Sequence, residues 1–429
     1  VSKALEGKVV VRHKGGDPLL FGRGGEEAQA LKAAGISFEF VSGVSSALAG
    51  PAYAGIPVTH RGFNSKLTII TGHENPEKGG SAINYDHLSK TDGTIVMLMG
   101  VGHISTVSAS LLEHGAKKSM PVALIRWATT GRQETLIGTL ETIADLVEKR
   151  GFKAPAVTVF GDVVNLRSEL NWFEDRPLFG KRIVVTRTRK QAGQFSGALQ
   201  SLGADILELP TIRVEPPKDI LEFGRLVQEA HSYDWLIFSS PNGAEAFFEM
   251  FYKIYSDARE LGGARIAAMG PGTAGKIRDY RFTVDLMPEN YVAESLVEAF
   301  EKEIGSVENL TMLWARAEKA RDVISKRLTQ LGAILDEGIA YRTVPETEDL
   351  GGGGERFRQE GADILTFTSS STVESFLRLG LPLPENLVIA SIGPITSKTL
   401  HSNGLYVDIE AREHDIPGLV EAIRQHYQS

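Results

Sequence analysis

The sequence predicts an α/β protein of two or three domains, the last of which contains two similar halves. Three observations predict this fold class. The chain has 429 residues, 42% of them hydrophobic and 23% charged, which is typical of soluble α/β proteins with full cores. Strand-like and helix-like segments alternate along the chain. A pattern of apolar runs that end in hydroxyl residues occurs twice after residue 180.

Composition and charge exclude several classes of function. The chain has no cysteine, which excludes disulfides, thiolate metal sites and a cysteine nucleophile. A net charge of −8 without a Lys/Arg tract argues against a nucleic-acid groove. No apolar run is long enough to span a bilayer and no leader is recognisable, so we expect no membrane association and a cytoplasmic location. The chain starts at Val1, close before an apolar run, and we expect it to be the interior of a longer protein.

The first 170 residues are expected to form one α/β domain. Six segments are predicted as strands: Val9–Arg12, Phe38–Val41, Leu67–Thr71, Thr94–Met99, Val122–Arg126 and Ala156–Phe160. Three segments are predicted as helices: Glu26–Ala34, Ile104–His114 and Leu140–Lys149. Residues 171–180 are polar with aromatic and proline punctuation, which predicts a linker. A new α/β unit then starts with the apolar run after Lys181.

Residues 181–429 contain a duplication. In one copy an apolar run ends at Ser239 and Ser240, and a second run ends in Gly-Pro-Gly-Thr at Thr273. In the other copy the corresponding residues are Ser369 and Ser370, and Thr396. Phe238 and Phe367 are 129 residues apart, as are Arg187 and Arg316. The shared offset indicates a duplicated domain, because this period is too long for a solenoid.

The end of each apolar run predicts an anion site. Each run is typical of a buried parallel strand, and each hydroxyl ending of the turn into a helix. Hydroxyls and free N–H groups at helix N-termini suit anions. Two such lobes facing a cleft predict a site for one large ligand rich in carboxylates. Two extended segments with prolines, residues 209–217 and 339–345, are expected to be paired connectors along which the lobes flex.

The first domain carries a series of glycine-rich motifs. Lys14-Gly15-Gly16-Asp17-Pro18 follows an apolar run, and its glycines permit close approach of a ligand to the backbone. Alone this motif is weak, and a tight turn is the alternative. Further motifs are Phe21-Gly-Arg-Gly-Gly-Glu-Glu27, Gly43-Val-Ser-Ser46, Ala52-Tyr-Ala-Gly-Ile-Pro-Val-Thr-His-Arg61, Thr71-Gly-His73 and Met97-Leu-Met-Gly100.

Together these motifs resemble the uroporphyrinogen-III C-methyltransferases of the tetrapyrrole methylase family, over residues 8 to about 170. The resemblance implies an S-adenosyl-L-methionine site, and the residues that it assigns to this cofactor are Gly15, Gly16, Asp17, Leu20, Ser45, Ser46, Met99 and Ala128. Arg23, His60, Arg61 and His73 are candidate tetrapyrrole contacts, because arginine forks match carboxylates. Their alternatives are structural salt bridges or caps. No metal site is expected.

The first domain departs from the family pattern in two ways. The family's opening segment, a glycine-rich turn followed by an Asp and a Lys linked to proton transfer, has no counterpart here. We therefore expect residues 1–170 to form a methylase domain that is incomplete at its N-terminus. Smaller departures are His13, Ser42 and Ser45, where the family usually has Leu, Pro and Thr.

Residues 181–429 resemble uroporphyrinogen-III synthase along nearly their whole length. The duplicated layout and the two Gly-Pro-x-Thr turns carry this resemblance, supported by Tyr341-Arg-Thr343. It implies two similar flavodoxin-like lobes. One would contain residues 181–212 and 346–429, and the other residues 216–340.

The implied reaction closes linear hydroxymethylbilane to uroporphyrinogen III with inversion of the last ring, without a cofactor. Tyr341 is the candidate proton donor to the leaving hydroxyl, and its alternative is a packed connector residue. The candidate substrate-binding residues are Arg187, Ser239, Ser240, Thr273, Arg316, Ser369, Ser370 and Thr396. Ordinary N-capping is the alternative for the hydroxyls, and an internal ion pair for the two arginines. Where the family has a tyrosine near residue 414, this chain has His414, which could substitute.

The two resemblances predict a bifunctional enzyme whose second module makes the substrate of the first. If the missing N-terminal segment is present, methylation at C2 and C7 would give precorrin-2, towards sirohaem or cobalamin. The family also implies a homodimer through the methylase module as an option. Two rivals are a tetrapyrrole carrier without turnover and a methylase of another corrinoid step. The motifs beside a synthase disfavour the second.

Overall fold

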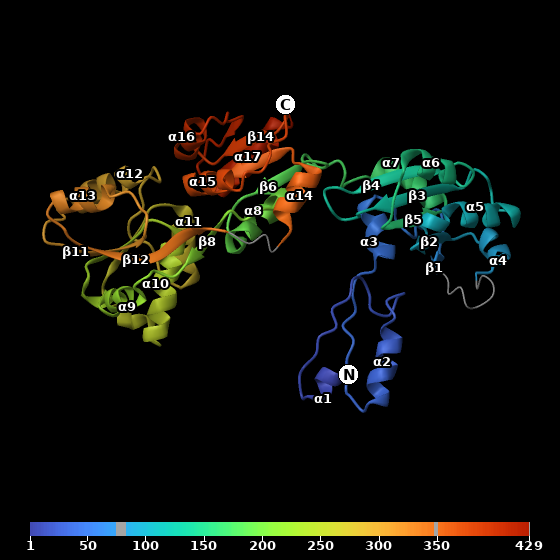
Figure 1. The fold of residues 1–429 in the computed structure, drawn as a ribbon, viewed down its shortest axis with the longest axis horizontal. Helices are drawn as coiled ribbons and strands as arrows, with labels where there is room; N and C mark the ends of the chain where they lie inside the picture. Colours follow the sequence, from blue (N-terminus) through green and yellow to red (C-terminus); the bar gives the residue numbers. More distant parts are fainter. Residues whose placement is uncertain (74–82, 347–350, 429) are drawn as a thin grey trace. The chain divides into compact units, whose positions relative to one another are not determined.

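The computed structural model describes residues 1–73, 83–346 and 351–428, and it divides into two compact units (Figure 1). Unit 1 comprises Val1–Arg182 with Leu199–Ile206, and unit 2 comprises Ile183–Ala198 with Leu207–Ser429. In the described residues no helix is both long and apolar enough to cross a membrane.

Unit 1 is built on a mixed five-stranded sheet with the order β1-β2-β5-β3-β4. Strands β1 and β2 are parallel, whereas β2–β5, β5–β3 and β3–β4 are antiparallel. The strands are β1 (Leu67–Thr71), β2 (Thr94–Leu98), β3 (Pro121–Arg126), β4 (Glu134–Thr139) and β5 (Ala156–Phe160). The helices are α1 (Ser2–Leu5), α2 (Gly24–Ala33), α3 (Ser46–Tyr53), α4 (Tyr85–Ser89), α5 (Ile104–Glu113), α6 (Ile143–Arg150) and α7 (Arg167–Leu170). Every residue of β2 is buried, as its continuous apolar run predicts for a strand covered on both faces.

Two predicted strands of unit 1 are wrong. Residues 9–12 and 38–41 are extended chain outside any strand, and their apolar side chains are exposed: Val9 is 96% and Val41 is 81% accessible. The β propensity of these runs is real, but a strand forms only where a neighbouring strand takes up its backbone hydrogen bonds. Within the described residues no strand pairs with either run. The other four predicted strands and the three helices are confirmed, with ends shifted by up to three residues.

Two further five-stranded sheets have the orders β15-β14-β13-β6-β7 and β10-β9-β11-β12-β8. They lie in unit 2, except that the first residue of β6 and the first two of β7 are assigned to unit 1. The strands of the first sheet are β6 (Arg182–Val185), β7 (Asp205–Glu208), β13 (Ile364–Phe367), β14 (Val388–Ser391) and β15 (Ile409–Glu410). Those of the second are β8 (Ile212–Glu215), β9 (Trp235–Phe238), β10 (Arg265–Ala268), β11 (Thr311–Ala317) and β12 (Ile334–Pro345). The second sheet takes in Ile212–Glu215 and the end of β12 to Pro345, residues outside the range 216–340 that the sequence assigns to that lobe.

Helices follow the strands of both sheets. They are α8 (Arg189–Ser201), α9 (Ile220–Gln228), α10 (Pro241–Ile254), α11 (Pro271–Asp279), α12 (Ala293–Ala299), α13 (Val323–Gln330), α14 (Gly353–Glu360), α15 (Ser370–Arg378), α16 (Pro394–Ser402) and α17 (Ile416–His426). The predicted duplication is confirmed, because β9 pairs in parallel with β10, as β13 does with β14. Each of these four strands leads directly into a helix, namely α10, α11, α15 and α16.

The predicted connectors pair with each other. Strand β8 runs antiparallel to the last residues of β12, with Val214 opposite Thr343 and Ile212 opposite Pro345. In Figure 1 they lie side by side in unit 2, β8 in green and β12 in orange. Because β12 also pairs with β11, this ribbon extends the second sheet.

Candidate functional site

A pocket of about 380 Å³ lies in unit 2 beside the β8–β12 ribbon. Its apolar wall comes mainly from β8, the start of α9 and one face of α10. Tyr341 of β12 and Asn242 of α10 line it, and so does Thr188, which follows β6 of the other sheet. The remaining lining residues are Ile212, Arg213, Val214, Glu215, Pro216, Pro217, Ile220, Phe223, Glu245, Ala246, Glu249, Met250, Lys253, Ala340 and Glu346.

Tyr341, the predicted proton donor, lies in this pocket. Its ring belongs to the core that includes Phe223 and Phe247, and the residue is 8% exposed. Its hydroxyl is 3.0 Å from the Oγ of Ser240. Burial raises the pKa of Tyr341, while hydrogen bonds from Ser240 and Asn242 lower it. The phenol therefore holds its proton at neutral pH and lies among hydrogen-bonding groups.

Charged groups of the pocket are largely paired with one another. Arg213 donates to Glu215 at 2.8 Å and to Glu346 at 3.4 Å, and Arg342 meets Glu215 at 2.5 Å. The hydrogen bond from Arg213 lowers the pKa of Glu215. These pairs lie along the ribbon, so they hold the two connectors in register as well as bordering the pocket.

The predicted anion-binding hydroxyls occupy corresponding places in the two lobes. Ser240 and Ser369 are the N-caps of α10 and α15, and their Oγ atoms accept from the N–H groups of Gly243 and Thr372. Thr273 and Thr396 lie in the first turns of α11 and α16, and each is 4% exposed. Ser240 and Ser369 thus act as N-caps, the alternative considered for the hydroxyls, and Thr273 and Thr396 are buried.

The other two hydroxyls bond within unit 2. Ser239 accepts from the indole N–H of Trp314 at 3.0 Å, and Ser370 lies 2.6 Å from the hydroxyl of Thr399. Of the six predicted hydroxyls, none is among the residues that line the described pocket, although Ser240 is in hydrogen-bond contact with Tyr341, which does line it. His414 lies against the start of α16, since a Cβ on Gly393 would be 2.8 Å from its ring.

The two predicted arginines differ in their surroundings. Arg316, in β11, forms an ion pair with Glu337 and donates to the carbonyl oxygens of Ala317 and Ala320 at 3.1 and 3.0 Å. Arg187 follows β6 and is partly buried, and this burial lowers the pKa of its guanidinium. The internal ion pair considered for these residues is therefore present at Arg316.

Two loops of the predicted cofactor site touch in unit 1. The carboxylate of Asp17 accepts from the N–H groups of Leu19 at 2.9 Å and Gly43 at 3.2 Å. A Cβ on Gly43 would lie 2.0 Å from the carbonyl oxygen of Gly16, so only glycine permits this approach. The contact brings the loop of Gly15, Gly16 and Asp17 beside Ser45, the N-cap of α3, and Ser46, its first residue.

The remaining predicted cofactor-binding residues lie at two places in unit 1. Leu20 and Ala128 both pack against the core of Ala47, Val96 and Val157. Met99 follows β2 with a left-handed φ of 55° and is 53% exposed. The structure thus groups Gly15, Gly16, Asp17, Ser45 and Ser46, groups Leu20 with Ala128, and leaves Met99 at the end of a neighbouring strand.

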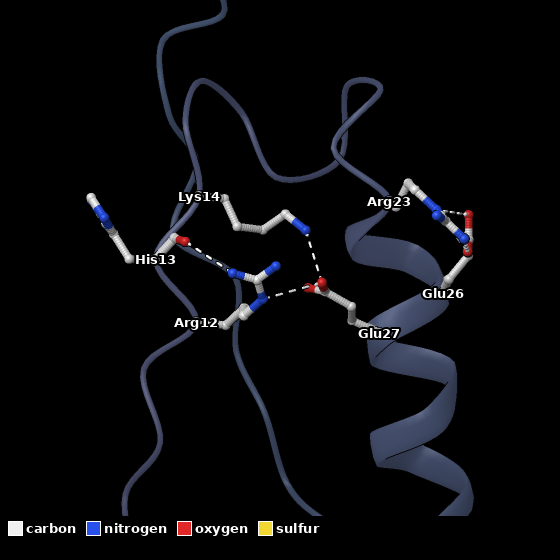
Figure 2. A network of polar contacts seen from close by, with 6 residues as sticks. All are labelled: Arg12, His13, Lys14, Arg23, Glu26 and Glu27. Atoms are coloured by element: carbon white, nitrogen blue, oxygen red, sulfur yellow. Dashed lines mark hydrogen bonds and ion pairs between the residues drawn. The ribbon is translucent and has the colours of Figure 1, made fainter.

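A network of ion pairs holds α2 to the residues before the glycine loop (Figure 2). Glu27 accepts from Lys14 at 3.0 Å and from Arg12 at 3.3 Å, and Arg12 also donates to the carbonyl oxygen of His13. On the same helix Glu26 pairs with Arg23 at 2.6 Å. The alternative considered for Arg23, a structural salt bridge, is thus present in the structure.

The predicted tetrapyrrole contacts after α3 are exposed. His60 and Arg61 lie in a turn, where the Nδ1 of His60 accepts from the N–H of Gly62 at 3.2 Å. His73 lies beyond β1, with its ring centroid 6.4 Å from that of His103. Neither histidine is brought together with Arg23 by any contact between the described residues.

Sequence reasoning missed several residues of these sites. The sequence does not single out Asn242, Glu245 and Glu249 of α10, which line the pocket. Their spacing along α10, at i, i+3 and i+7, indicates that they share one face of the helix. It does not indicate that this face borders a pocket. Gln133 and Glu174 of unit 1 likewise carry no signal in the sequence.

Comparisons with known proteins find a matching family for each of the two parts of the chain. The family described as Uroporphyrinogen-III synthase HemD matches residues 193–421, and the Tetrapyrrole (Corrin/Porphyrin) Methylases match residues 1–144. The Porphyrin biosynthesis protein HemD of Ruminiclostridium josui is 35% identical over 93% of this chain and 79% of its own length. An S-adenosyl-L-methionine-dependent uroporphyrinogen III methyltransferase of Methanosarcina barkeri is 54% identical over 40% of this chain and 67% of its own. A solved uroporphyrinogen III synthase of Thermus thermophilus is 17% identical over 58% of this chain and 99% of its own, with a TM-score of 0.42.

Proposed function

Because the chain belongs to the uroporphyrinogen-III synthase family and, in its first part, to the tetrapyrrole methylases, we propose how its residues carry out two successive reactions. The fusion is a bifunctional enzyme of tetrapyrrole biosynthesis, with a synthase module and a uroporphyrinogen-III methyltransferase module. The observation that carries the proposal for the synthase is the buried hydroxyl of Tyr341, 3.0 Å from Ser240 at a pocket beside the connectors.

In the synthase step Tyr341 acts as the general acid. Hydroxymethylbilane loses its terminal hydroxyl when the C–O bond breaks, and the proton of Tyr341 leaves with that oxygen as water. The resulting azafulvene is attacked by the substituted carbon of the terminal ring. The spiro intermediate rearranges, so that the ring is inverted in uroporphyrinogen III, and the proton lost at ring closure returns to the tyrosinate. The apolar pocket wall supports this role, since it suits a pyrrole ring and keeps bulk water away from the acid.

The carboxylates of the substrate are bound at the helix starts of both lobes. Ser239, Ser240 and Thr273 stand at the starts of α10 and α11, and Ser369, Ser370 and Thr396 at those of α15 and α16. Their hydroxyls and the free N–H groups of each first turn donate to carboxylates without the full charge that would hold the substrate too tightly. Arg187 and Arg316 are both proposed as carboxylate contacts, and for Arg316 this role requires its ion pair with Glu337 to open.

In the methyltransferase step the loops joined by Asp17 hold S-adenosyl-L-methionine. The residues fit this group, because Gly15 leaves open space above its backbone and the contact of Gly16 with Gly43 leaves no room for side chains. When bound, the cofactor supplies an electrophilic methyl group. Ser45, Ser46 and Met99 offer polar and thioether contacts to it, and Leu20 and Ala128 an apolar wall. Arg23, His60 and Arg61 are proposed to bind the carboxylates of uroporphyrinogen III, which is methylated at C2 and C7.

Incubation of the full chain with hydroxymethylbilane, followed by separation of the product isomers, tests the synthase step. We expect the III isomer, because spontaneous closure gives the I isomer. A second incubation of the same protein with uroporphyrinogen III and S-adenosyl-L-methionine should give a product heavier by two CH2 units, because each added methyl group replaces a proton. Formation of the I isomer alone would contradict the synthase proposal and support a carrier.

A further inference from the structure

Residues 167–176 pack against one end of α3 in unit 1, although the sequence predicts a linker from residue 171. The indole N–H of Trp172 donates to the carbonyl oxygen of Ala52 at 2.9 Å, and the ring of Phe173 is buried 4.9 Å from that of Tyr53. A Cβ on Gly55 would be 2.5 Å from the carbonyl oxygen of Leu170. The segment therefore lies against the C-terminal end of the helix whose N-terminal end carries Ser45 and Ser46.

Gln133 connects this segment to the loop of Ala128. It is 5% exposed, and its Oε1 accepts from the N–H of Thr129 at 3.0 Å. Its Nε2 donates to the carbonyl oxygen of Tyr53 at 3.1 Å and to Glu174 at 2.8 Å. One buried amide thus holds the loop, the end of α3 and the segment after α7.

The loop that Gln133 holds is strained. Trp127 and Thr129, on either side of Ala128, have left-handed φ values of 46° and 72°. Such conformations are costly for non-glycine residues and persist where surrounding contacts over-determine them. The loop also meets α3 directly, since a Cβ on Gly50 would lie 3.7 Å from the Cβ of Ala128.

Glu174 is the acceptor on which these contacts converge. Besides Gln133 it accepts from the hydroxyl of Thr135 at 2.7 Å and from Arg167 at 2.5 Å. Arg167 in turn donates to the carbonyl oxygen of Ala54 at 2.6 Å. The side chains of Arg167 and Glu174 are 13% and 16% exposed. Three donors around one partly buried acceptor require a carboxylate, because an amide would turn an N–H group towards one of them.

We propose that Gln133 and Glu174 are positioning residues of the methyltransferase, which fix Ala128 and the end of α3 in the geometry that binds S-adenosyl-L-methionine. The segment after α7 is then part of the methyltransferase site and not only a tether. The inference rests on the proposed function, since it takes Ala128, Ser45 and Ser46 as cofactor contacts.

Binding of S-adenosylhomocysteine to the full chain, measured by calorimetry, tests the inference in the variants Glu174→Gln and Gln133→Met. Asp175→Asn is the matched control. It removes the same charge one residue away, where Asp175 is exposed and, within the part of the chain that the structure describes, accepts from Asn171. We expect roughly tenfold weaker binding for each of the first two variants, and a change within about twofold for the control.

Two further measurements separate positioning from loss of the fold. In steady-state assays the KM for S-adenosyl-L-methionine should rise in both variants, while the KM for uroporphyrinogen III stays unchanged. The loss of affinity in the double variant should be smaller than the two single effects combined, because the two changes share the hydrogen bond between Gln133 and Glu174. Variants that merely unfold unit 1 would instead lose binding of both substrates together.

The outcomes distinguish the inference from the proposal beneath it. A wild-type chain that binds no S-adenosylhomocysteine overturns the cofactor site itself. Wild-type binding that Glu174→Gln and Gln133→Met leave unchanged overturns the positioning role and keeps the site. A loss of both substrates in both variants also overturns it, since the role would then be structural.

Discussion

At the scale of single residues, the surroundings of Tyr341 decide its chemistry. A phenol in water is a weak acid with a pKa of about 10. Burial raises the pKa of Tyr341, so the residue carries its proton at neutral pH, and the hydroxyl of Ser240 and the side chain of Asn242 moderate that rise. A proton donor of this kind suits a step in which a leaving hydroxyl needs a proton only as its bond breaks.

Tyr341→Phe should lower the rate of uroporphyrinogen III formation by roughly a hundredfold or more, the usual contribution of a general acid. The ring remains in its core, so the fold should be preserved. Product analysis with hydroxymethylbilane measures the rate. Tyr233→Phe is the control, because Tyr233 is another buried tyrosine of the same lobe whose hydroxyl donates to Asp336 at 2.6 Å. Equal losses in both variants would contradict the assignment.

The raised pKa of Tyr341 also predicts a pH dependence of stability. A group whose pKa is higher in the folded protein contributes stability that is fully present below its unfolded pKa and is lost as the pH rises through the folded value. The unfolding free energy of the wild type minus that of Tyr341→Phe should therefore be constant up to about pH 9 and decrease above about pH 10. Urea denaturation at a series of pH values measures it. Other tyrosines cancel in the comparison, and a difference that grows with pH would contradict the prediction.

At the scale of elements, the junctions from strand to helix place the polar groups. The helices that follow β9 and β13 have serine N-caps, and those that follow β10 and β14 have glycine N-caps. A proline at the first helical position starts α10, α11 and α16. Proline is favoured there because its missing N–H would have no partner in the helix anyway. In parallel sheets these ends lie on one edge, so each lobe presents its helix N-termini together.

The contact of two loops in unit 1 gives an element-scale prediction. Gly43→Ala places a methyl group 2.0 Å from the carbonyl oxygen of Gly16, so the loops must separate and binding of S-adenosylhomocysteine should weaken by roughly tenfold or more. Calorimetry on the full chain measures this. Gly25→Ala is the matched control, since a Cβ there meets nothing within 4 Å on α2. Unchanged affinity in Gly43→Ala would show that the loop contact does not shape the site.

At the scale of the whole molecule, two compact units carry different reactions on one chain. The synthase candidates Tyr341 and Ser240 lie in unit 2, and the methyltransferase candidates Asp17 and Ala128 lie in unit 1. Each unit has hydrophobic clusters of its own, with Phe247 and Trp314 in unit 2 and Leu124 and Val159 in unit 1. Separate cores mean that a local change in one site need not disturb the other.

Variants at the two sites should therefore separate the two activities. Tyr341→Phe should block conversion of hydroxymethylbilane but leave methylation of added uroporphyrinogen III within about twofold of the wild type. Gly43→Ala should lower methylation of uroporphyrinogen III and leave conversion of hydroxymethylbilane within about twofold of the wild type. Parallel assays of both steps on each purified variant measure this. A loss of both activities in either variant, with the protein still folded, would show that the sites are coupled.

The sequence by itself determined the local and repeated features of this protein. The duplication, the strands β1 and β5, and the hydroxyl endings of the repeats follow from short-range patterns, because burial on a sheet and capping of a helix depend on neighbouring residues. The glycine motifs and the paired turns were also sufficient to predict both families. Short-range patterns failed at residues 9–12 and 38–41, where β propensity is present and a partner strand is absent among the described residues.

Only the tertiary structure decided which distant residues meet. Ser240 and Tyr341 are 101 positions apart and Gln133 and Glu174 are 41 apart, yet each pair shares a hydrogen bond. The antiparallel pairing of β8 with β12 likewise joins segments more than 120 residues apart, such as Val214 and Thr343. Propensity and periodicity act over a few residues, whereas such contacts depend on how whole sheets and helices pack, and a single sequence carries no direct record of that packing.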